Sequence, residues 1–89
     1  MAYSVRVSNT AKAHLKLLRT KCPQMLSRVV LLLDGVLLDP RTGLGKPERL
    51  KHYNSREVWS RRIDKKNRLV YEIRADEITI LSVFGHYVN

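Results

Sequence analysis

The segment from Val58 to Tyr71, VWSRRIDKKNRLVY, constrains the fold more than any other part of the sequence. On both sides of its centre, residues alternate with a period of two, which is typical of strands with two unlike faces. The centre, Asp64-Lys65-Lys66-Asn67, favours a turn because Asp and Asn side chains can bond their own backbone. We therefore predict a β-hairpin. It presents five cations close together, a surface suited to phosphate groups: Arg61, Arg62, Lys65, Lys66 and Arg68.

The composition indicates a folded domain with an anionic partner. The chain has 89 residues, which is room for one domain, residues 1–89, with one modest core. Hydrophobic residues make up 44% of it, too many for a disordered chain, and the net charge is +9. Such an imbalance indicates nucleic acid, an acidic protein or a membrane surface as the partner. Residues 41–74 hold eleven Lys and Arg against four acids, which favours a binding surface over a solvated basic face.

Cysteine usage and hydropathy bear on the compartment. Cys22 is the one cysteine, so a disulfide within the chain and a thiolate metal cluster are both excluded. The first residues contain no apolar run of signal-peptide length. The apolar run Leu26–Leu38 is broken by Arg28, Asp34 and Gly35 and is too short and too charged to span a bilayer. We expect a cytoplasmic protein that does not engage a membrane.

The remaining elements follow from periodicity and breakers. We expect strands near residues 3–7, 58–63, 68–74 and 78–86 and helices near 10–21 and 24–38. Ser8, Asn9 and Thr10 offer N-caps for the first helix, Pro23 suits the first turn of the second, and Pro40 ends it. Gly35 weakens the second helix and predicts fraying or a bend there. Residues 39–46, DPRTGLGK, read as a loop but lack the spacing of a phosphate-binding P-loop.

The order β-α-α-β-β-β predicts an α+β fold, a small, mostly antiparallel sheet with two N-terminal helices packed on one face. The opposite face is expected to be open and lined by polar residues. The last strand is apolar on both faces and is expected to be central, with Ile78, Ile80, Ser82, Phe84 and His86 on one face. The second helix is so apolar that it lies either at the centre of the core or between the sheet and another chain.

Glu48, Arg68 and His86 are the residue types that a metal-free transphosphorylation of RNA needs. A base takes the proton from a ribose 2′-OH, a guanidinium stabilises the phosphorane, and an acid protonates the leaving 5′-oxygen. Taken singly, each residue also fits an ordinary role. A Glu among Lys and Arg is most often a surface ion pair, and a lone His is more often structural or exposed.

Three motifs, GKPERLK at 45–51, WSRRIDKKNRLVY at 59–71 and FGHY at 84–87, resemble the Txe/YoeB toxins of the RelE-like superfamily in order and spacing. Residues before 45 resemble the family only in their β-α-α pattern. The resemblance implies a RelE-like microbial RNase fold and the toxin of a type II toxin–antitoxin system that cuts mRNA in the ribosomal A site. It implies that Glu48 is the general base, Arg68 stabilises the phosphate and His86 is the general acid. Substrate-binding roles are implied for Lys51, Arg61, Arg62 and Tyr87, and no cofactor or metal is expected.

The partners implied by the resemblance are the ribosome, mRNA and a cognate acidic antitoxin of the YefM/Axe kind. A partly disordered antitoxin would order on the apolar run Val29–Leu38 and the basic surface. A homodimer through the same helix is the competing explanation. Family members often end at or near the His-Tyr pair, whereas this sequence continues with Val88 and Asn89.

Two other functions stay open. A catalytically inert member of the fold would bind RNA or, like the ParE relatives, DNA gyrase. A basic structural protein would coat nucleic acid. The joint presence of Glu48, Arg68 and His86 favours the ribonuclease. Aromatic residues are only 7% of the chain, which argues against a coat protein because single-strand binders stack bases on aromatic side chains.

Overall fold

The structure is a computed structural model in which residues 2–84 are described. In chain order its elements are β1 (Ser4–Val7), α1 (Asn9–Lys21), α2 (Pro23–Leu38), β2 (Glu48–Arg49), the short 3-10 helix η1 (Lys51–Tyr53), β3 (Glu57–Arg62), β4 (Arg68–Arg74) and β5 (Glu77–Ser82). Both helices and the strands β1, β3 and β4 lie within one residue of their predicted bounds. The hairpin predicted between Val58 and Tyr71 is confirmed as β3 and β4.

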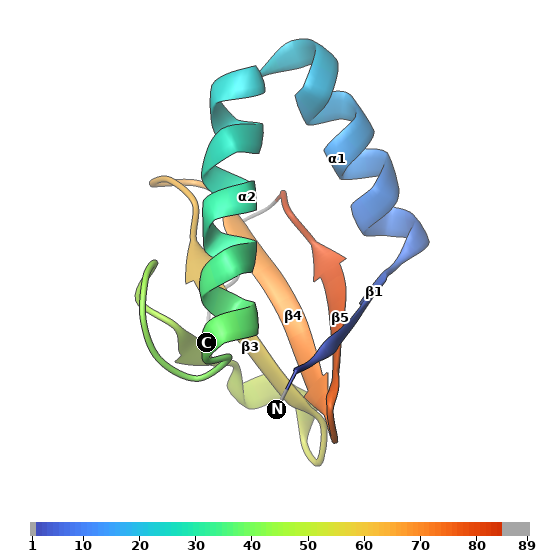
Figure 1. Cartoon of the computed structure of the whole chain (residues 1–89), viewed down its shortest axis with the longest axis vertical. Helices are drawn as coiled ribbons and strands as arrows, with labels where there is room; N and C mark the ends of the chain where they lie inside the picture. The colour runs from blue at the N-terminus through green and yellow to red at the C-terminus, as the bar shows by residue number, and fades with distance from the viewer. Residues whose placement is uncertain (1, 85–89) are drawn as a thin grey trace.

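The strands form one sheet in the order β1-β5-β4-β3-β2 (Figure 1). β1 runs parallel to β5, and the other neighbours are antiparallel. Both helices cover the same face of this sheet (Figure 1). The predicted α+β fold with a mostly antiparallel sheet is therefore confirmed. The predicted order lacked one strand, because β2 is only two residues long and pairs with β3 at the edge of the sheet.

The helix boundaries follow from capping and from close packing. The Ser8 side-chain oxygen accepts a hydrogen bond from the Ala11 backbone N–H, 3.1 Å away, and so caps α1. Pro23 occupies the first turn of α2. The helix continues through Gly35 to Leu38, so the fraying predicted at Gly35 is not found. A Cβ at Gly35 would lie 3.0 Å from Nη1 of Arg61, which explains the glycine. Among residues 2–84, neither helix combines the length and the hydropathy that a bilayer span requires.

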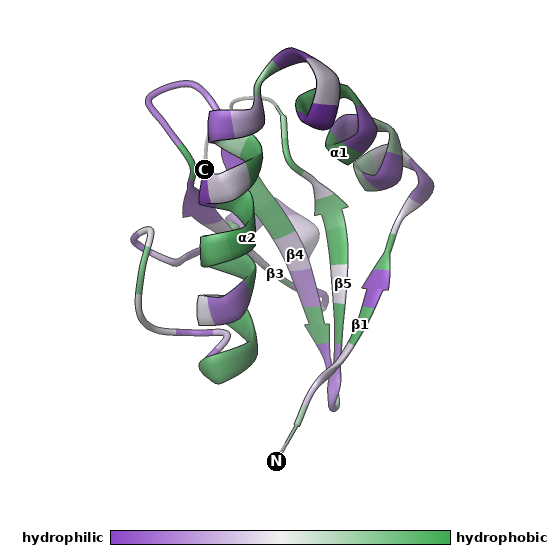
Figure 2. Ribbon diagram, turned by 45° about the horizontal axis from the view of Figure 1, so that its top comes forward, coloured by the Kyte–Doolittle hydropathy of each residue, from purple (hydrophilic) through white to green (hydrophobic). Residues whose placement is uncertain are grey.

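The main core lies between the two helices and the sheet, where apolar residues of α2 face apolar strands (Figure 2). Val29, Leu32 and Val36 of α2 are fully buried there. The strands contribute Leu69, Tyr71, Ile73, Ile78 and Ile80. α2 is thus central to the core. It also leaves a second set of apolar side chains exposed, namely Val30, Leu31, Leu37 and Leu38.

A smaller apolar cluster covers part of the opposite sheet face. Leu50, Val58 and Val70 are buried in it, and Tyr53 and Leu81 pack against them. The prediction of a wholly open face was therefore wrong, because the segment after β2 folds back over the sheet. The open part lies farther along β3 and β4, where Arg62 is exposed and Arg68 is half-buried.

The last strand is shorter than predicted and is interrupted by a bulge. Val70 pairs with Ser82 and Tyr71 pairs with Ile80, so Leu81 is an extra residue in β5. The bulge shifts the alternation, and Val83 lies in the helix-side core with Ile80 instead of on the other face. The expected continuation of the strand to residues 85 and 86 lies outside the described residues.

The prediction that the hairpin presents Arg61 together with the other cations was wrong, because Arg61 is fully buried. Its Nη1 donates to the carbonyl of Leu44 at 3.0 Å, and its Nη2 donates to those of Asp39 and Thr42. Its Nε donates to the Tyr71 hydroxyl at 3.1 Å, and that hydroxyl donates to the Pro40 carbonyl at 2.6 Å. The side chain therefore holds the loop that joins α2 to β2.

We predict that Arg61→Met lowers the free energy of unfolding by about 2–4 kcal/mol, because three loop carbonyls and a buried hydroxyl lose a charged donor. The control is Arg62→Met on the neighbouring exposed residue, which is expected to change stability by less than about 0.5 kcal/mol. Urea unfolding followed by circular dichroism measures both. Equal unfolding midpoints for the wild type and Arg61→Met would show that the buried guanidinium does not stabilise the fold.

Candidate functional site

Glu48 lies in β2 at the edge of the sheet, and its side chain is exposed. The loop before it is fixed in an unusual conformation, with positive φ at Gly45 and Lys46. A Cβ at Gly45 would lie 2.6 Å from Cδ2 of Leu32, so only glycine allows this close approach. The Gly45 carbonyl also accepts a hydrogen bond from the Arg62 backbone N–H at 2.6 Å. Glu48 therefore follows a loop that is hydrogen-bonded to β3 three residues earlier, at Gly45.

A row of paired residues runs from Glu48 across the sheet. Glu48 pairs with Ser60, Ser60 with Val70, and Val70 with Ser82. Because directly paired residues share a sheet face, these four side chains lie on the face away from the helices. Ser82 is the last paired residue of β5 and lies four positions before His86 in the sequence.

Arg62 and Arg68 pair with each other two residues farther along β3 and β4, so they share the face of Glu48. Adjacent strands lie about 4.8 Å apart and residues rise about 3.4 Å along a strand, which puts the backbones of Glu48 and Arg68 roughly 12 Å apart. Both side chains are long enough to reach one phosphate group placed between them. The structure thus brings together a carboxylate and two guanidinium groups that are far apart in the sequence.

Two serine hydroxyls lie within this row, and sequence reasoning missed both. Ser60 is fully buried, and its Oγ has no hydrogen-bond partner within the described part of the chain. The Ser82 Oγ donates to the Phe84 carbonyl at 3.2 Å. The available signal for Ser60 was its place between Val58 and Arg62 in the alternating strand, which puts it on the same face as both.

The other predicted site residues divide into three cases. Lys51 lies in η1 and is exposed, as is Arg62. Arg61 is buried and its guanidinium is bonded to the loop carbonyls, so the prediction that it contacts substrate was wrong. His86 and Tyr87 lie outside the described residues.

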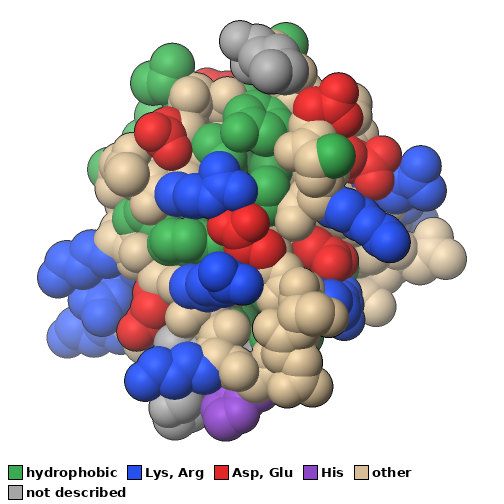
Figure 3. Space-filling view, turned by 90° about the horizontal axis from the view of Figure 1, so that it is seen from below, with side chains coloured by type: hydrophobic (Ala, Val, Ile, Leu, Met, Phe, Trp, Pro, Cys, Tyr) green, Lys and Arg blue, Asp and Glu red, His purple; other side chains and the backbone are tan. Residues whose placement is uncertain are grey.

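Two of the cations of residues 41–74, Arg41 and Arg56, form ion pairs with neighbouring acids. Arg41 forms a two-bond ion pair with Glu57, at 2.7 and 2.9 Å, and the Trp59 indole N–H also donates to that carboxylate. The Arg41 guanidinium holds the pKa of Glu57 below its usual value. Arg56 pairs with Glu72 in the same way and lowers the pKa of that carboxyl. Figure 3 shows such interleaving of basic and acidic side chains on one end of the molecule.

The hairpin tip differs from these ion-paired positions, because its two lysines add positive charge next to the end of the sheet. Lys65 and Lys66 are exposed there, and the Asp64 carboxylate accepts from the backbone N–H groups of Lys66 and Asn67 at 2.8 and 2.7 Å. The tip is therefore an ordered turn that extends the basic surface of Arg62 and Arg68. No group of three or more His, Cys, Asp or Glu among residues 2–84 is arranged to hold a metal ion.

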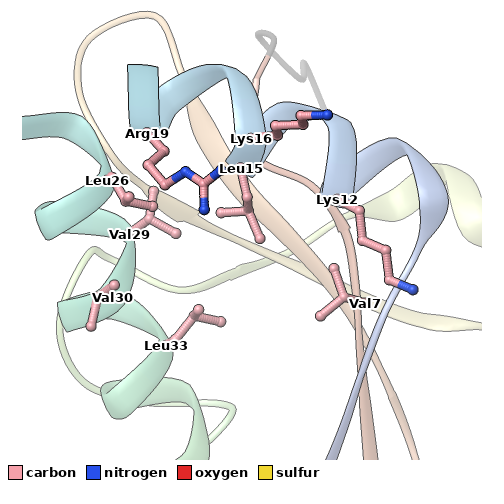
Figure 4. A pocket seen from close by; sticks show the side chains of 9 residues that line it. All are labelled: Val7, Lys12, Leu15, Lys16, Arg19, Leu26, Val29, Val30 and Leu33. Atoms are coloured by element: carbon pink, nitrogen blue, oxygen red, sulfur yellow. The ribbon is translucent and has the colours of Figure 1, made fainter. Parts of the chain in front are cut away.

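A second candidate surface lies on the helix side of the molecule. A groove of about 530 Å³ runs between α1 and α2 beside β1. Leu15 of α1 and Leu26, Val29, Val30 and Leu33 of α2 line it, with Val7 at its end. Three cations of α1, Lys12, Lys16 and Arg19, border it, and Arg19 extends from α1 toward α2 (Figure 4). This groove is apolar inside and basic along one edge.

The fold is shared with the RelE class of toxins. The archaeal RelE–RelB complex from Pyrococcus horikoshii OT3 contains a chain with a TM-score of 0.73 at 17% identity, and the similarity covers 100% of both chains. At that identity the likeness concerns the fold alone. Staphylococcus aureus YoeB is 30% identical, with a TM-score of 0.87 in a YoeB dimer, covering 98% of this chain and 100% of that one. The same YoeB in a heterotetrameric YoeB–YefM toxin–antitoxin complex gives a TM-score of 0.83.

Sequence comparison then identifies the family. The pattern of the YoeB-like toxin of bacterial type II toxin–antitoxin systems matches residues 8–87. Toxin YoeB of Synechocystis sp. is 44% identical over 64 residues, which are 72% of this chain and 73% of that toxin. The chain belongs to the YoeB-like toxin family, and it is the toxin of a type II toxin–antitoxin system.

Proposed function

We propose that this toxin is a ribosome-dependent mRNA endoribonuclease that inhibits translation by a metal-independent transphosphorylation. The observation that carries the proposal is the shared sheet face of Glu48, Arg62 and Arg68, built by strand pairing from three different strands. A carboxylate beside two guanidinium groups combines a proton acceptor with a receiver for a phosphate.

In the proposed reaction, the Glu48 carboxylate takes the proton of a ribose 2′-OH. The 2′-oxygen attacks the adjacent phosphorus, and the bond from phosphorus to the 5′-oxygen breaks. Arg68 stabilises the charge that grows on the phosphorane oxygens. His86 supplies the proton that the leaving 5′-oxygen takes up. The products are a 2′,3′-cyclic phosphate on one fragment and a 5′-OH on the other.

Substrate binding is assigned to the exposed groups around this centre. Arg62 shares the face of Arg68, and Lys51 follows Glu48 by three residues in η1. Both can contact phosphates that flank the scissile one. Tyr87 keeps the substrate-binding role that the family resemblance implies. Arg61 acts on substrate only indirectly, through the loop that leads to Glu48.

The exposure of Glu48 and Arg62 supports the requirement for a ribosome. A site on an open sheet face cannot by itself hold a flexible mRNA in the in-line geometry that attack by the 2′-oxygen needs. Holding reactants in the right geometry can lower an activation barrier by several kcal/mol. A ribosome that binds the mRNA would position the 2′-oxygen in this way. The proposed activity thus belongs to the cytoplasm, where ribosomes and mRNA meet.

We predict that Glu48→Gln, Arg68→Ala and His86→Ala each slow single-turnover cleavage on programmed ribosomes by at least about tenfold, since positioned acids and bases typically contribute about 10²–10⁴-fold. Arg74→Ala is the matched control, because Arg74 is an exposed arginine at the other end of β4. Circular dichroism checks that each variant is folded.

Two results would contradict the proposal. Cleavage at the wild-type rate by both Arg68→Ala and His86→Ala would mean that the site is misplaced. If the wild-type protein leaves mRNA on ribosomes intact but inhibits DNA gyrase, the ParE-like alternative replaces the ribonuclease.

The toxin's partner is proposed to be an acidic antitoxin of the YefM kind, with an amphipathic helix that docks in the groove between α1 and α2. An apolar groove accepts such a helix through anchors at every third or fourth residue. The cations Lys12, Lys16 and Arg19 along its edge complement acidic side chains on the docked segment. The dimer and the YoeB–YefM complex of the S. aureus relative support both this partner and a homodimer as its competitor.

Substitutions at two neighbouring residues of α2 can distinguish antitoxin binding from homodimer formation. Val30 lines the groove and Leu31 does not, although their exposed fractions are 52% and 53%. We predict that Val30→Asp weakens antitoxin binding by about tenfold or more, because it replaces an apolar anchor by a charge that repels acidic residues. Leu31→Asp is expected to change binding by less than about threefold. Titration calorimetry with the antitoxin measures both. A larger effect of Leu31→Asp would move the contact to the other side of α2, and loss of self-association by that variant would favour the homodimer.

A further inference from the structure

His14 of α1 contacts the end of β5 just before the terminal segment. The His14 Nδ1 accepts a hydrogen bond from the Val83 backbone N–H at 3.2 Å. The His14 ring also packs edge-on against Phe84, with ring centroids 4.9 Å apart and an interplanar angle of 62°. These contacts join residues separated by about seventy positions in the sequence. The proposed function gives no role to His14, and its place in the sequence gave no signal.

The contact satisfies a backbone group that the sheet leaves without a ladder partner. Strand pairing between β4 and β5 ends at Val70 and Ser82, directly after the bulge at Leu81. Val83 is fully buried, so its N–H needs an acceptor inside the protein. An imidazole nitrogen takes this role, which it can do only while Nδ1 carries no proton.

A second contact holds the same segment to the start of α1. The Ser8 hydroxyl donates to the Leu81 carbonyl at 3.0 Å, and the Ser8 backbone N–H donates to the Ile80 carbonyl at 2.9 Å. Ser8 therefore fixes β5 before the bulge, and His14 fixes the chain after it. The direction in which the chain leaves β5 is set between these two points.

We infer that His14 is a positioning residue: its imidazole holds Val83 and Phe84, from which the chain continues to the proposed general acid His86 and to Tyr87. This inference rests on the proposed function for the part that concerns His86. The contact with Val83 stands independently of it. His14 itself does not touch the reacting atoms.

Three substitutions separate the hydrogen bond from the ring contact. His14→Asn keeps an acceptor at about the position of Nδ1 and removes most of the ring. His14→Phe keeps an aromatic ring against Phe84 and removes the acceptor, and His14→Ala removes both. The control is His52→Ala, since His52 is exposed in η1 and far from Val83 in the sequence.

Amide hydrogen exchange of Val83 tests the contact without any reference to activity. His14→Phe and His14→Ala are expected to speed exchange at Val83 by about tenfold or more, while His14→Asn retains most of the protection. Exchange at Val83 that is unchanged in His14→Phe and His14→Ala would overturn the inference, because another group would then hold the N–H.

Single-turnover cleavage on programmed ribosomes tests the positioning role. His14→Phe and His14→Ala are expected to lower the rate at saturating ribosomes by about tenfold, with unchanged affinity for ribosomes, because a small misplacement of a catalytic group is costly. His14→Asn is expected to restore most of the rate. Wild-type rates in all three variants, with faster exchange at Val83, would reduce His14 to a structural residue and overturn the positioning role. If Arg68→Ala and His86→Ala also both cleave at the wild-type rate, the proposed function fails instead, and exchange at Val83 alone decides whether His14 holds the end of β5.

Discussion

The guanidinium of Arg61 lies inside the protein and holds the loop between α2 and β2 against the sheet. A buried cation is costly unless its donors are satisfied, and here three backbone carbonyls and the Tyr71 hydroxyl accept from it. Burial raises the pKa of Tyr71, so its hydroxyl stays protonated and donates in turn to Pro40. The Arg61 side chain also lies against Gly35 of α2. One arginine thus fixes the helix, the loop and the sheet relative to each other, and the loop it fixes leads directly to Glu48.

The main core and the proposed site lie on opposite faces of the sheet. The helix side carries the main core, whereas the other side carries a small apolar cluster around Leu50 and, beyond it, the exposed Glu48 and Arg62. The groove between α1 and α2 lies on the helix side, away from Glu48. A partner segment docked there would leave the proposed site uncovered. An antitoxin that silences the toxin by covering that site must therefore pass around the edge of the sheet.

The sequence predicted the elements well where the period of the apolar residues was unambiguous, as in both helices and in the hairpin. It placed Arg61 wrongly, although the same alternation put that residue between Trp59 and Ile63 on the apolar face; its charge outweighed its position in the interpretation. β2 was missed because two residues carry no period. The bulge at Leu81 was missed because it changes pairing without changing the pattern of apolar residues. Motif resemblance pointed to Glu48 and Arg68, but that they share one face follows only from strand register. The alternation in β3 placed Ser60 on the face of Arg62 but did not mark it as a site residue, and His14 gave no signal because its partners are set by tertiary contacts.

The central proposal is that the 2′-oxygen of the mRNA is the nucleophile and that a side chain of the toxin accepts its proton. The most direct measurement uses programmed ribosomes that carry an mRNA with a single 2′-deoxynucleotide at the 5′ side of the scissile phosphate, compared with the all-ribose mRNA. The account predicts that the deoxy-substituted mRNA is not cut at that position. It also predicts that the all-ribose mRNA yields a 2′,3′-cyclic phosphate and a 5′-OH. Cleavage of the deoxy-substituted mRNA at the rate of the control, or a product with a 5′-phosphate, would contradict it.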